Sequence, residues 1–555
     1  MSQETSHLEI IPLGGLGEFG MNMMVYRWGS DCLIVDAGMM FPGGFLPGVD
    51  FVLPDLSFLD DAGTIHGLVL THAHEDHIGG VPHLLERHPV PVWGTRYTIE
   101  LLRQKFAQRQ TASTPDFRFL PASPETVRIG PFGVEAIAVA HSVPQTRLIA
   151  IETPAGHIIH SADFKLDEDP PDGEGTDTRR LVELGHRGVL ALLSDSTNAE
   201  RSGVTPGEAI VHQGLDEILA QASGRVVLTT FASNVQRLAG LGRLAARHGR
   251  RLALLGAAVN LHAEIAQQLD LLALPAGVRI GGDKIAELPR SSVLAVASGS
   301  QGEPLSAMAR IASAQHRDLA LEAGDTVIHS ARIIPGNEKP IGRMFNKLLR
   351  QGARIITAAD APVHVSGHAA ADELRQLIEW LNPRWFVPIH GEYRQLDAHV
   401  RLAIATGLEP QRILLAESGD RIALDEHRFE IAGKVPVGRT YMESGGDEVT
   451  WDQVRDRRKS SQDGVVVALV NIAEHGGTSK GYPWIVSRGF APGLDVEGEM
   501  LERSRQAIAA ALEEAPAAER GDARALEARI ELHLRRCIRR TVQRYPLVIA
   551  MVRGL

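Results

Sequence analysis

The stretch THAHEDHIGG, which follows the apolar run GLVL, constrains the fold more than any other part of the sequence. It contains four side chains that can bind a transition metal, namely His72, His74, Asp76 and His77. A turn at the end of a strand can direct such side chains into one pocket before a helix that we expect to begin near Ile78. An exposed polar loop would instead leave them in water, and the stretch alone is compatible with either interpretation.

Three further apolar runs lead into residues of the same kind. The runs EAIAVA, HIIHSA and RWFVPI are followed by His141, Asp163 and His390, respectively. Because open α/β sheets place their sites beyond the carboxyl ends of the strands, we expect these residues to converge with the first group. The seven side chains suffice for two metal ions that share a bridging carboxylate, so the sequence predicts a dinuclear metal centre.

The composition limits the available ligands and partners. The chain has 555 residues and only two cysteines, Cys32 and Cys537, too few for a disulfide framework or a thiolate zinc site. No apolar run approaches the roughly 18 residues of a membrane span and no secretory signal is visible, so we expect a cytoplasmic protein with no membrane partner. The formal net charge of −11 does not exclude nucleic acid, because a local basic channel and bound cations can override it.

The length suggests about three or four domains. Residues 1–204 mix short strands with helices, and between 205 and 355 strands and helices alternate as in an inserted parallel-sheet domain. Residues 356–430 are interpreted as a return to the first domain, 431–455 as a polar, glycine-rich linker, and 456–555 as a small α+β domain.

Gly15 to Gly20 match the G-x-G-x-x-G fingerprint of dinucleotide-binding folds, and Asp36 lies at a suitable distance for the ribose-binding acid. The fingerprint requires a helix to begin at the third glycine. The following MNMMVYRWGSDCLIVDAG instead indicates two strands around a Gly-Ser turn. We therefore interpret the glycines as a hairpin whose backbone closely approaches another segment, rather than as a nicotinamide site.

Several turns are suited to binding anions. Asp195 ends another apolar run, TFASNVQR opens a predicted helix, and SGSQGEP and SARIIPGNE are glycine- and hydroxyl-rich turns. The segment HVSGH, His364 to His368, adds two imidazoles and a hydroxyl. Turns of this kind can bind phosphate through backbone N–H groups, and an imidazole beside them can protonate a leaving oxygen. Each turn taken alone is more typical of an ordinary β-α loop.

Taken together, these motifs resemble a known family. T-H-x-H-x-D-H-I-G-G followed by a distant His, an Asp and a late His resembles the metallo-β-lactamase superfamily. With SDST, TFASN, GSQGEP, IPGNE, HVSGH and PIHGEYR, essentially the whole chain is most similar to the β-CASP nucleases of the bacterial ribonuclease J family. The resemblance implies an α/β fold: a metallo-β-lactamase αββα sandwich, an inserted β-CASP parallel α/β domain and a small C-terminal α+β domain.

The resemblance also implies roles for individual residues. One metal would be bound by His72, His74 and His141, the other by Asp76, His77 and His390, and Asp163 would bridge them. A hydroxide between the metals, expected to be zinc with manganese as the alternative, would attack the phosphodiester. Asp195 and His368 are the expected catalytic residues, with His368 protonating the departing 3′ oxygen. The expected substrate-binding residues are Ser233, Asn234, His364, Val365, Ser366, Gly367 and His368. A structural calcium ion is expected near Asp50.

The implied activity is 5′-to-3′ hydrolysis of single-stranded RNA that carries a 5′-monophosphate, with internal cleavage in some contexts, in RNA decay and in rRNA and mRNA maturation. His390 is typical of the RNA-processing members. A homodimer or homotetramer and protein partners in RNA decay are also implied. The alternatives are a small-molecule ester or lactone hydrolase on the same metal core, a DNA-directed β-CASP nuclease and an inactive metal-binding scaffold.

Two positions depart from the family pattern. Gln145 stands where an acid is expected, so hydrogen bonding around His141 can differ. The stretch Gly256–Asn260 replaces a more polar segment, which leaves the contacts of that loop open.

Overall fold

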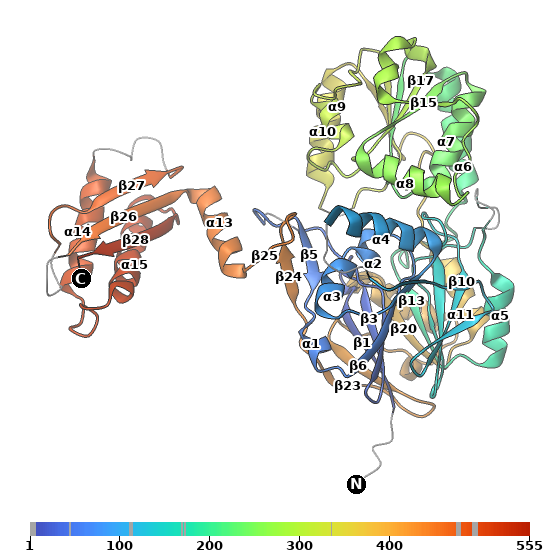
Figure 1. Ribbon diagram of the computed structural model, residues 1–555, viewed down its shortest axis with the longest axis horizontal. Coiled ribbons are helices and arrows are strands. Elements are labelled where there is room, and N and C mark those ends of the chain that lie inside the picture. Colours follow the sequence, from blue (N-terminus) through green and yellow to red (C-terminus); the bar gives the residue numbers. More distant parts are fainter. Residues whose placement is uncertain are drawn as a thin grey trace, which may run out of the picture. The chain divides into compact units, whose positions relative to one another are not determined.

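A computed structural model describes residues 7–43, 46–109, 115–167, 170, 174–334, 336–472, 479–490 and 498–554. Two units can be distinguished, Met1–Met40 with Leu53–Arg439 and Phe41–Val52 with Thr440–Leu555. The first contains a sandwich with an insertion, and the second contains the C-terminal α+β domain (Figure 1). None of the described helices combines the length and the apolar character that a membrane crossing requires.

The first layer of the sandwich is a mixed sheet in the order β23-β22-β1-β3-β4-β6-β7-β8. Its strands are β1 (Leu8–Gly14), β3 (Met23–Trp28), β4 (Asp31–Val35), β6 (Thr64–Val69), β7 (Val92–Gly94), β8 (Phe117–Phe119), β22 (Asp420–Leu424) and β23 (Phe429–Lys434). The predicted Gly-Ser turn joins β3 to β4, so that Trp28 pairs with Asp31. The parallel neighbours β4 and β6 pair Val35 with Val69, and both strands therefore end at the same edge of the sheet.

The second layer is a sheet in the order β20-β13-β12-β11-β10-β9. Its strands are β9 (Thr126–Ile129), β10 (Phe132–Ala138), β11 (Arg147–Thr153), β12 (Gly156–His160), β13 (Ala191–Asp195) and β20 (Trp385–Ile389). Strands β12, β13 and β20 are parallel neighbours, with His160 opposite Leu193 and Asp195 opposite Ile389. Their carboxyl ends consequently share one edge.

Apolar side chains fill both the space between the sheets and the space under the outer helices. Tyr26 and Phe132 belong to the core between the layers, whereas Leu84 and Leu374 belong to the two outer cores. The helices are α1 (Ser57–Asp60), α2 (Glu75–Ile78), α3 (Val81–Arg87) and α4 (Arg96–Arg109), then α5 (Thr178–Arg187), α11 (Ala371–Leu381), α12 (Tyr393–Ala405) and η3 (Pro410–Arg412). This is the predicted αββα sandwich. The helix expected near Ile78 begins earlier, at Glu75, because the loop that carries His72 and His74 turns directly into α2.

The insertion contains a parallel sheet in the order β16-β15-β17-β14-β18-β19. Its strands are β14 (Val226–Thr229), β15 (Arg251–Leu255), β16 (Arg279–Ile280), β17 (Val293–Ala297), β18 (Thr326–His329) and β19 (Arg354–Ile356). Its helices are α6 (Glu208–Gln221), α7 (Val235–Arg247), α8 (Ala257–Gln268), η1 (Gly282–Glu287), η2 (Arg290–Ser292), α9 (Ala307–Ala312) and α10 (Glu338–Arg350). Helices lie on both faces of the sheet (Figure 1), which explains why β14, β17 and β18 are buried at every position.

The glycine-rich stretch after β1 forms no dinucleotide site. The short strand β2 (Leu16–Gly17) pairs with β21 (Gly391–Glu392), and β3 rather than a helix follows Gly20. Gly15 and Gly20 adopt φ of 87° and 101°, a region that disfavours side chains. The two glycines let the backbone lie close to Asn22 and Met40, because Cβ atoms at Gly15 and Gly20 would lie 2.3 Å from Asn22 Oδ1 and 2.9 Å from Met40 Cβ.

The C-terminal unit has a sheet in the order β27-β26-β28 with helices packed on one face. Its elements are α13 (Trp451–Asp463), β26 (Val465–Asn471), β27 (Trp484–Arg488), α14 (Glu499–Glu513), α15 (Ala523–Val542) and β28 (Leu547–Arg553). A further small sheet has the order β25-β24-β5, with β5 (Phe51–Pro54), β24 (Arg439–Met442) and β25 (Glu448–Val449). The segment 431–455, interpreted as a linker, thus contains strands and the start of α13, where Thr450 caps the helix by accepting from the Gln453 N–H.

A buried ion pair in the insertion makes a testable contribution to stability. Arg237 on α7 donates from Nε and Nη2 to the two carboxylate oxygens of Glu208 on α6, at 2.6 and 2.8 Å, and both side chains are buried. Replacing Arg237 by Met leaves an unpaired buried carboxylate, so we expect the free energy of unfolding in urea to fall by about 3–5 kcal/mol.

Arg247 on the same helix provides a matched control. Its side chain is 67% exposed and pairs with Asp216, so Arg247→Met should cost no more than about 1 kcal/mol. Equal losses in the two variants would contradict a role for burial.

Candidate metal centre

The loop after β6 is clamped against the end of β4. Ala37 donates a backbone hydrogen bond to the carbonyl oxygen of His77 at 2.8 Å. Gly38 permits this approach, because a Cβ atom there would lie 1.7 Å from the carbonyl oxygen of Asp76. The loop is therefore fixed at the edge where β4 and β6 both end.

The remaining candidate ligands follow strands of the second sheet. Asp163 lies three residues after β12 and His390 immediately after β20, while Asp195 is the last residue of β13. His141 lies three residues after β10. Because β12, β13 and β20 run parallel, the topology brings these side chains to one place, as the sequence predicted.

One group of ligand atoms consists of three imidazole nitrogens and one carboxylate oxygen. The Nδ1 atom of His74 lies 3.1 Å from Nε2 of His72 and 3.2 Å from Nε2 of His141. Asp163 Oδ2 lies 3.6 and 3.8 Å from the same two Nε2 atoms. All four atoms are close enough to one another to hold a single metal ion.

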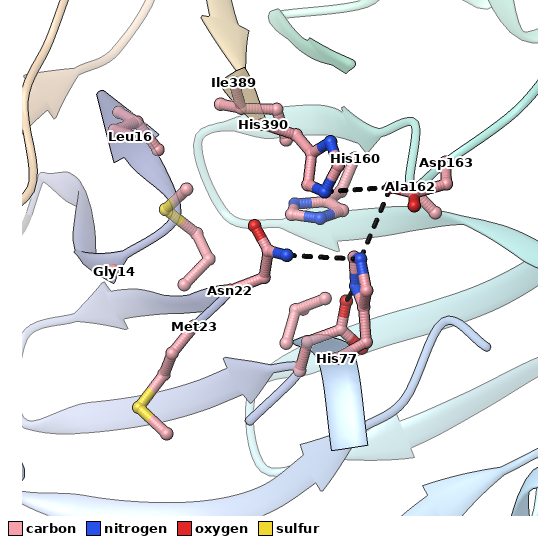
Figure 2. A pocket seen from close by; sticks show the side chains of 13 residues that line it. Gly14, Leu16, Asn22, Met23, His77, His160, Ala162, Asp163, Ile389 and His390 are labelled. Carbon is pink, nitrogen blue, oxygen red and sulfur yellow. Dashed lines mark hydrogen bonds and ion pairs between the residues drawn. The ribbon is translucent and has the colours of Figure 1, made fainter. Parts of the chain in front are cut away.

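A second group lies on the other side of Asp163. Its Oδ1 atom is 3.4 Å from Nε2 of His77 and 3.7 Å from Nε2 of His390. Asp76 Oδ2 is 3.7 and 3.4 Å from those nitrogens. Figure 2 shows His77, His390 and Asp163 directed toward one another in a shared pocket.

These residues fit divalent cations. Asp163 is buried, and its Oδ1 atom has no hydrogen-bond partner among the described residues although imidazoles surround it. An unpartnered carboxylate oxygen in this position is costly unless a cation contacts it. Imidazole and carboxylate donors suit zinc and manganese.

Each candidate imidazole is held by a hydrogen bond on the ring nitrogen that faces away from the centre. Such contacts fix the tautomer and the orientation of metal-binding histidines. The partners are Thr71 Oγ1 for His72 at 2.9 Å, Ser233 Oγ for His74 at 3.1 Å, Asp36 Oδ2 for His77 at 2.7 Å, the Gly367 carbonyl for His141 at 2.7 Å and Thr197 Oγ1 for His390 at 2.8 Å.

Asp36 supports two of these imidazoles, a role that the sequence did not predict. It accepts from His77 Nδ1 directly, and it accepts from the hydroxyl of Thr71 at 2.8 Å, which in turn contacts His72. Asp36 is 1% exposed and has φ of 62°. The acid that matches the end of a dinucleotide fingerprint thus positions candidate metal ligands.

Burial controls the charge of part of the cluster. It lowers the pKa of His72 and of His141 well below the ordinary value, so both rings are neutral at pH 7. Burial acts in the same direction on His77 and His390, but the carboxylates, Asp163 first, outweigh it and raise both pKa values. The carboxylates of the cluster therefore carry the negative charge that a bound cation would balance.

Asp195 and His368 lie beside the second group. His368 Nδ1 is 2.8 Å from Asp195 Oδ2, and its Nε2 is 4.0 Å from Asp163 Oδ2. Asp195 Oδ1 is also 3.3 Å from His390 Nδ1. The pair therefore directs the second imidazole nitrogen, Nε2, toward Asp163, and the His368 side chain is 19% exposed.

The structure distributes the predicted substrate-binding residues over different environments. Ser366 lies beside His368, where Ser366 Oγ is 2.9 Å from Asn198 Nδ2 and accepts from the His368 N–H at 3.2 Å, whereas His364 Nδ1 is 3.3 Å from Nη1 of Arg237 in the insertion. The others have structural contacts. Ser233 and Gly367 hold His74 and His141, Asn234 accepts from the Arg237 N–H to cap α7, and Val365 packs on a hydrophobic core. Their contacts with substrate stay predictions.

Two open points concern Gln145 and Asp50. Gln145 Oε1 accepts from the backbone N–H of Tyr97 at 3.0 Å, so the position does not carry the contact to His141, which the Gly367 carbonyl makes. Asp50 accepts from the Ser444 N–H at 2.7 Å and belongs to none of the described groups of metal-binding side chains. Calcium binding near Asp50 stays a prediction.

Models of known protein families match most of the chain. Four family models match it: "Metallo-beta-lactamase superfamily" over 16–202, "Ribonuclease J, beta-CASP domain" over 223–348, "Zn-dependent metallo-hydrolase RNA specificity domain" over 360–413 and "Ribonuclease J C-terminal domain" over 453–554.

Individual relatives agree. The chain is 36% identical to ribonuclease J of Synechocystis sp., with 99% of this chain and 87% of the relative covered. It is 37% identical to ribonuclease J of Sinorhizobium meliloti, with 100% and 98% covered. A crystal structure of a protein of unknown function from Enterococcus faecalis V583 is similar in fold, with a TM-score of 0.52, 15% identity, and 76% of this chain and 100% of that chain covered.

The position of Asp36 predicts an effect on metal binding. Asp36→Ala removes the acceptor that orients His77 and, through Thr71, His72. We expect metal affinity to fall about 10- to 100-fold, measured by competition with a chelator. Asp31→Asn, at the start of the strand that precedes Asp36, is the control, since Asp31 is 39% exposed and its carboxylate pairs only with His66 among the described residues. Unchanged affinity in Asp36→Ala would contradict the assignment.

Proposed function

The chain belongs to the ribonuclease J family of metal-dependent ribonucleases, and on this premise we propose that it degrades single-stranded RNA from a 5′-monophosphorylated end. Cleavage would proceed 5′ to 3′, with internal cuts in some contexts, in RNA decay and in rRNA and mRNA maturation. The single observation that carries the proposal is Asp163, whose two oxygens each face a separate group of ligand atoms next to a phosphate-suited segment.

We infer that two divalent cations occupy the centre, zinc with manganese as the alternative. His72, His74 and His141 would hold one, Asp76, His77 and His390 the other, and Asp163 would contact both. When bound, such cations activate water and withdraw charge from the oxygens of the phosphate.

Asp195 and His368 supply the proton transfer in this proposal. Asp195 holds His368 at Nδ1, so Nε2 is the nitrogen available to the leaving group. His368 donates its proton to the departing 3′ oxygen, which would otherwise leave as an alkoxide. Asp195 also holds His390 and thereby links the orientation of the acid to that of a metal ligand.

The segment HVSGH is the proposed place for the 5′-phosphate. Ser366 offers a hydroxyl, and the backbone N–H of His368 lies 3.2 Å from that hydroxyl oxygen. A pocket at a fixed distance from the cations accounts for removal of one nucleotide per cut, and a triphosphate would be too large and too charged for it. The cytoplasmic location and protein partners in RNA decay stay predictions.

We further propose a homodimer or homotetramer formed through the C-terminal unit. Helices α14 and α15 cover one face of its sheet. On the other face Ile549 pairs with Val467 and Met551 with Leu469, and the exposed fractions of Ile549, Met551 and Trp484 are 39%, 52% and 61%. A second copy would cover this apolar surface. Light scattering should give at least a dimer that Met551→Glu weakens, and a strictly monomeric wild type would contradict the proposal.

Replacing His368 by Ala separates proton transfer from metal binding. We expect kcat to fall about 10²- to 10⁴-fold while the metal content is retained. His77→Ala is the contrasting variant, because it removes a ligand atom and should lower the metal content as well as the rate. Metal loss in His368→Ala would mean that this histidine is a ligand instead.

The substrate is tested with one RNA, labelled at its 5′ end and carrying either a monophosphate or a triphosphate. Rapid release of labelled mononucleotide from the monophosphorylated form alone is the expected result. Equal internal cutting of both forms would contradict action from the 5′ end. Equal cleavage of the corresponding DNA would favour a DNA-directed nuclease, and turnover of an ester without RNA cleavage would favour an ester or lactone hydrolase.

A further inference from the structure

Arg332, in the turn SARIIPGNE after β18, lies beside the proposed phosphate pocket. Its Nη1 donates to Asn198 Oδ1 at 3.0 Å. Asn198 is 1% exposed and donates from Nδ2 to Ser366 Oγ and to the carbonyl oxygen of His368, both at 2.9 Å. One asparagine therefore ties the guanidinium to the segment that carries the proton donor.

The backbone that carries Arg332 is itself fixed. Gln301, which is 7% exposed, donates from Nε2 to the carbonyl oxygen of Arg332 at 2.8 Å. Its Oε1 accepts from the Ile334 N–H at 2.9 Å. Hydrogen bonds thus connect the turns SGSQGEP and SARIIPGNE and fix the backbone on either side of Arg332.

The charges around the pocket identify which group can balance a phosphate. Burial, and then the nearby charge of Arg237, lowers the pKa of His364 to about 3, so this imidazole is neutral. Arg237 is itself neutralised by Glu208. Neither residue brings an unbalanced positive charge to Ser366.

Arg332 does bring an unbalanced positive charge to the pocket. It is partly buried, and within the described part of the chain its side chain forms no ion pair with a carboxylate. The charges of two further cations, Arg201 and Arg394, act on it and, after burial, lower its pKa. A partly buried guanidinium with one neutral partner and cationic neighbours is unfavourable until an anion contacts it.

We propose that Arg332 recognises the terminal 5′-phosphate of the RNA beside Ser366 and thereby sets the preference for a monophosphorylated end. This inference rests on the proposed function, since it presupposes that the 5′-phosphate lies at HVSGH. A guanidinium suits this task because its parallel N–H groups can bind two phosphate oxygens while Nη1 keeps its contact with Asn198. An internal phosphodiester, with a single charge, would gain less from the contact.

The test compares one RNA with a 5′-monophosphate and with a 5′-hydroxyl, using the metal-loaded full-length protein. The quantity is the ratio of kcat/KM for the two forms. In Arg332→Gln we expect this ratio to fall about 10- to 100-fold, mainly through KM of the monophosphorylated RNA, as for one lost charge-assisted contact. Arg332→Lys keeps the positive charge but lacks the parallel N–H groups of the guanidinium, so it should retain part of the ratio.

Arg394 is the matched control. It lies in the same cationic group but already pairs with Glu200 and Glu392, at 2.9 and 3.0 Å. Arg394→Gln should leave the ratio of kcat/KM values unchanged. If the ratio fell as much as in Arg332→Gln, the effect would come from the overall positive charge of this region, and the inference would be overturned.

Three other outcomes are decisive. If the wild type has a large ratio and Arg332→Gln leaves it intact, the role of Arg332 is overturned while the proposed 5′-end preference stands. An equal loss on both RNAs would show a general strand contact and overturn it as well. A wild-type ratio near one would overturn the proposed 5′-end preference, and the inference with it. Metal content, measured in every variant, excludes a disturbed centre as the cause of a changed ratio.

Discussion

The buried carboxylate of Asp163 is the group on which the rest of the structure depends. Each of its oxygens faces a different set of imidazoles, and one oxygen lacks any hydrogen-bond donor among the described residues. A carboxylate in this environment is stable only when cations surround it, whether they are protonated imidazoles or metal ions. The fold meets this requirement by ending parallel strands from distant parts of the chain at one edge, so that residues from 72 to 390 converge.

The residues that hydrogen-bond to the candidate ligands come from all parts of the first unit. His77 rests on Asp36 at the end of β4, His390 on Thr197 after β13, and His74 on Ser233 at the start of α7 in the insertion. The segment HVSGH both holds His141 through the Gly367 carbonyl and supplies His368. A Cβ atom at Gly367 would lie 2.7 Å from the His141 ring, so the glycine is required by the ligand that it supports.

Strand periodicity predicted the inserted parallel sheet, and the position of His and Asp after apolar runs predicted the convergence of the seven ligand candidates, because both are local signals. The αββα sandwich followed only from the resemblance to a known family. It did not reveal Asp36, whose role depends on a positive φ and on a contact with Thr71 across two strands. Asn198 was missed for the same reason, since its three contacts join segments more than 130 residues apart. In 431–455 the glycines and polar residues suggested a linker, but pairing with other strands, which local composition does not encode, orders part of it.

The hydrogen bond between His74 and Ser233 has a thermodynamic consequence. It joins a candidate metal ligand of the sandwich to the N-terminal end of a helix in the insertion, so its formation depends on the closeness of the two domains. Separating the insertion from the sandwich would remove the partner that orients His74 and would weaken the binding of a metal ion there. Because coupling free energies are reciprocal, a metal ion held by His74 would in turn favour contact between the two domains by the same amount.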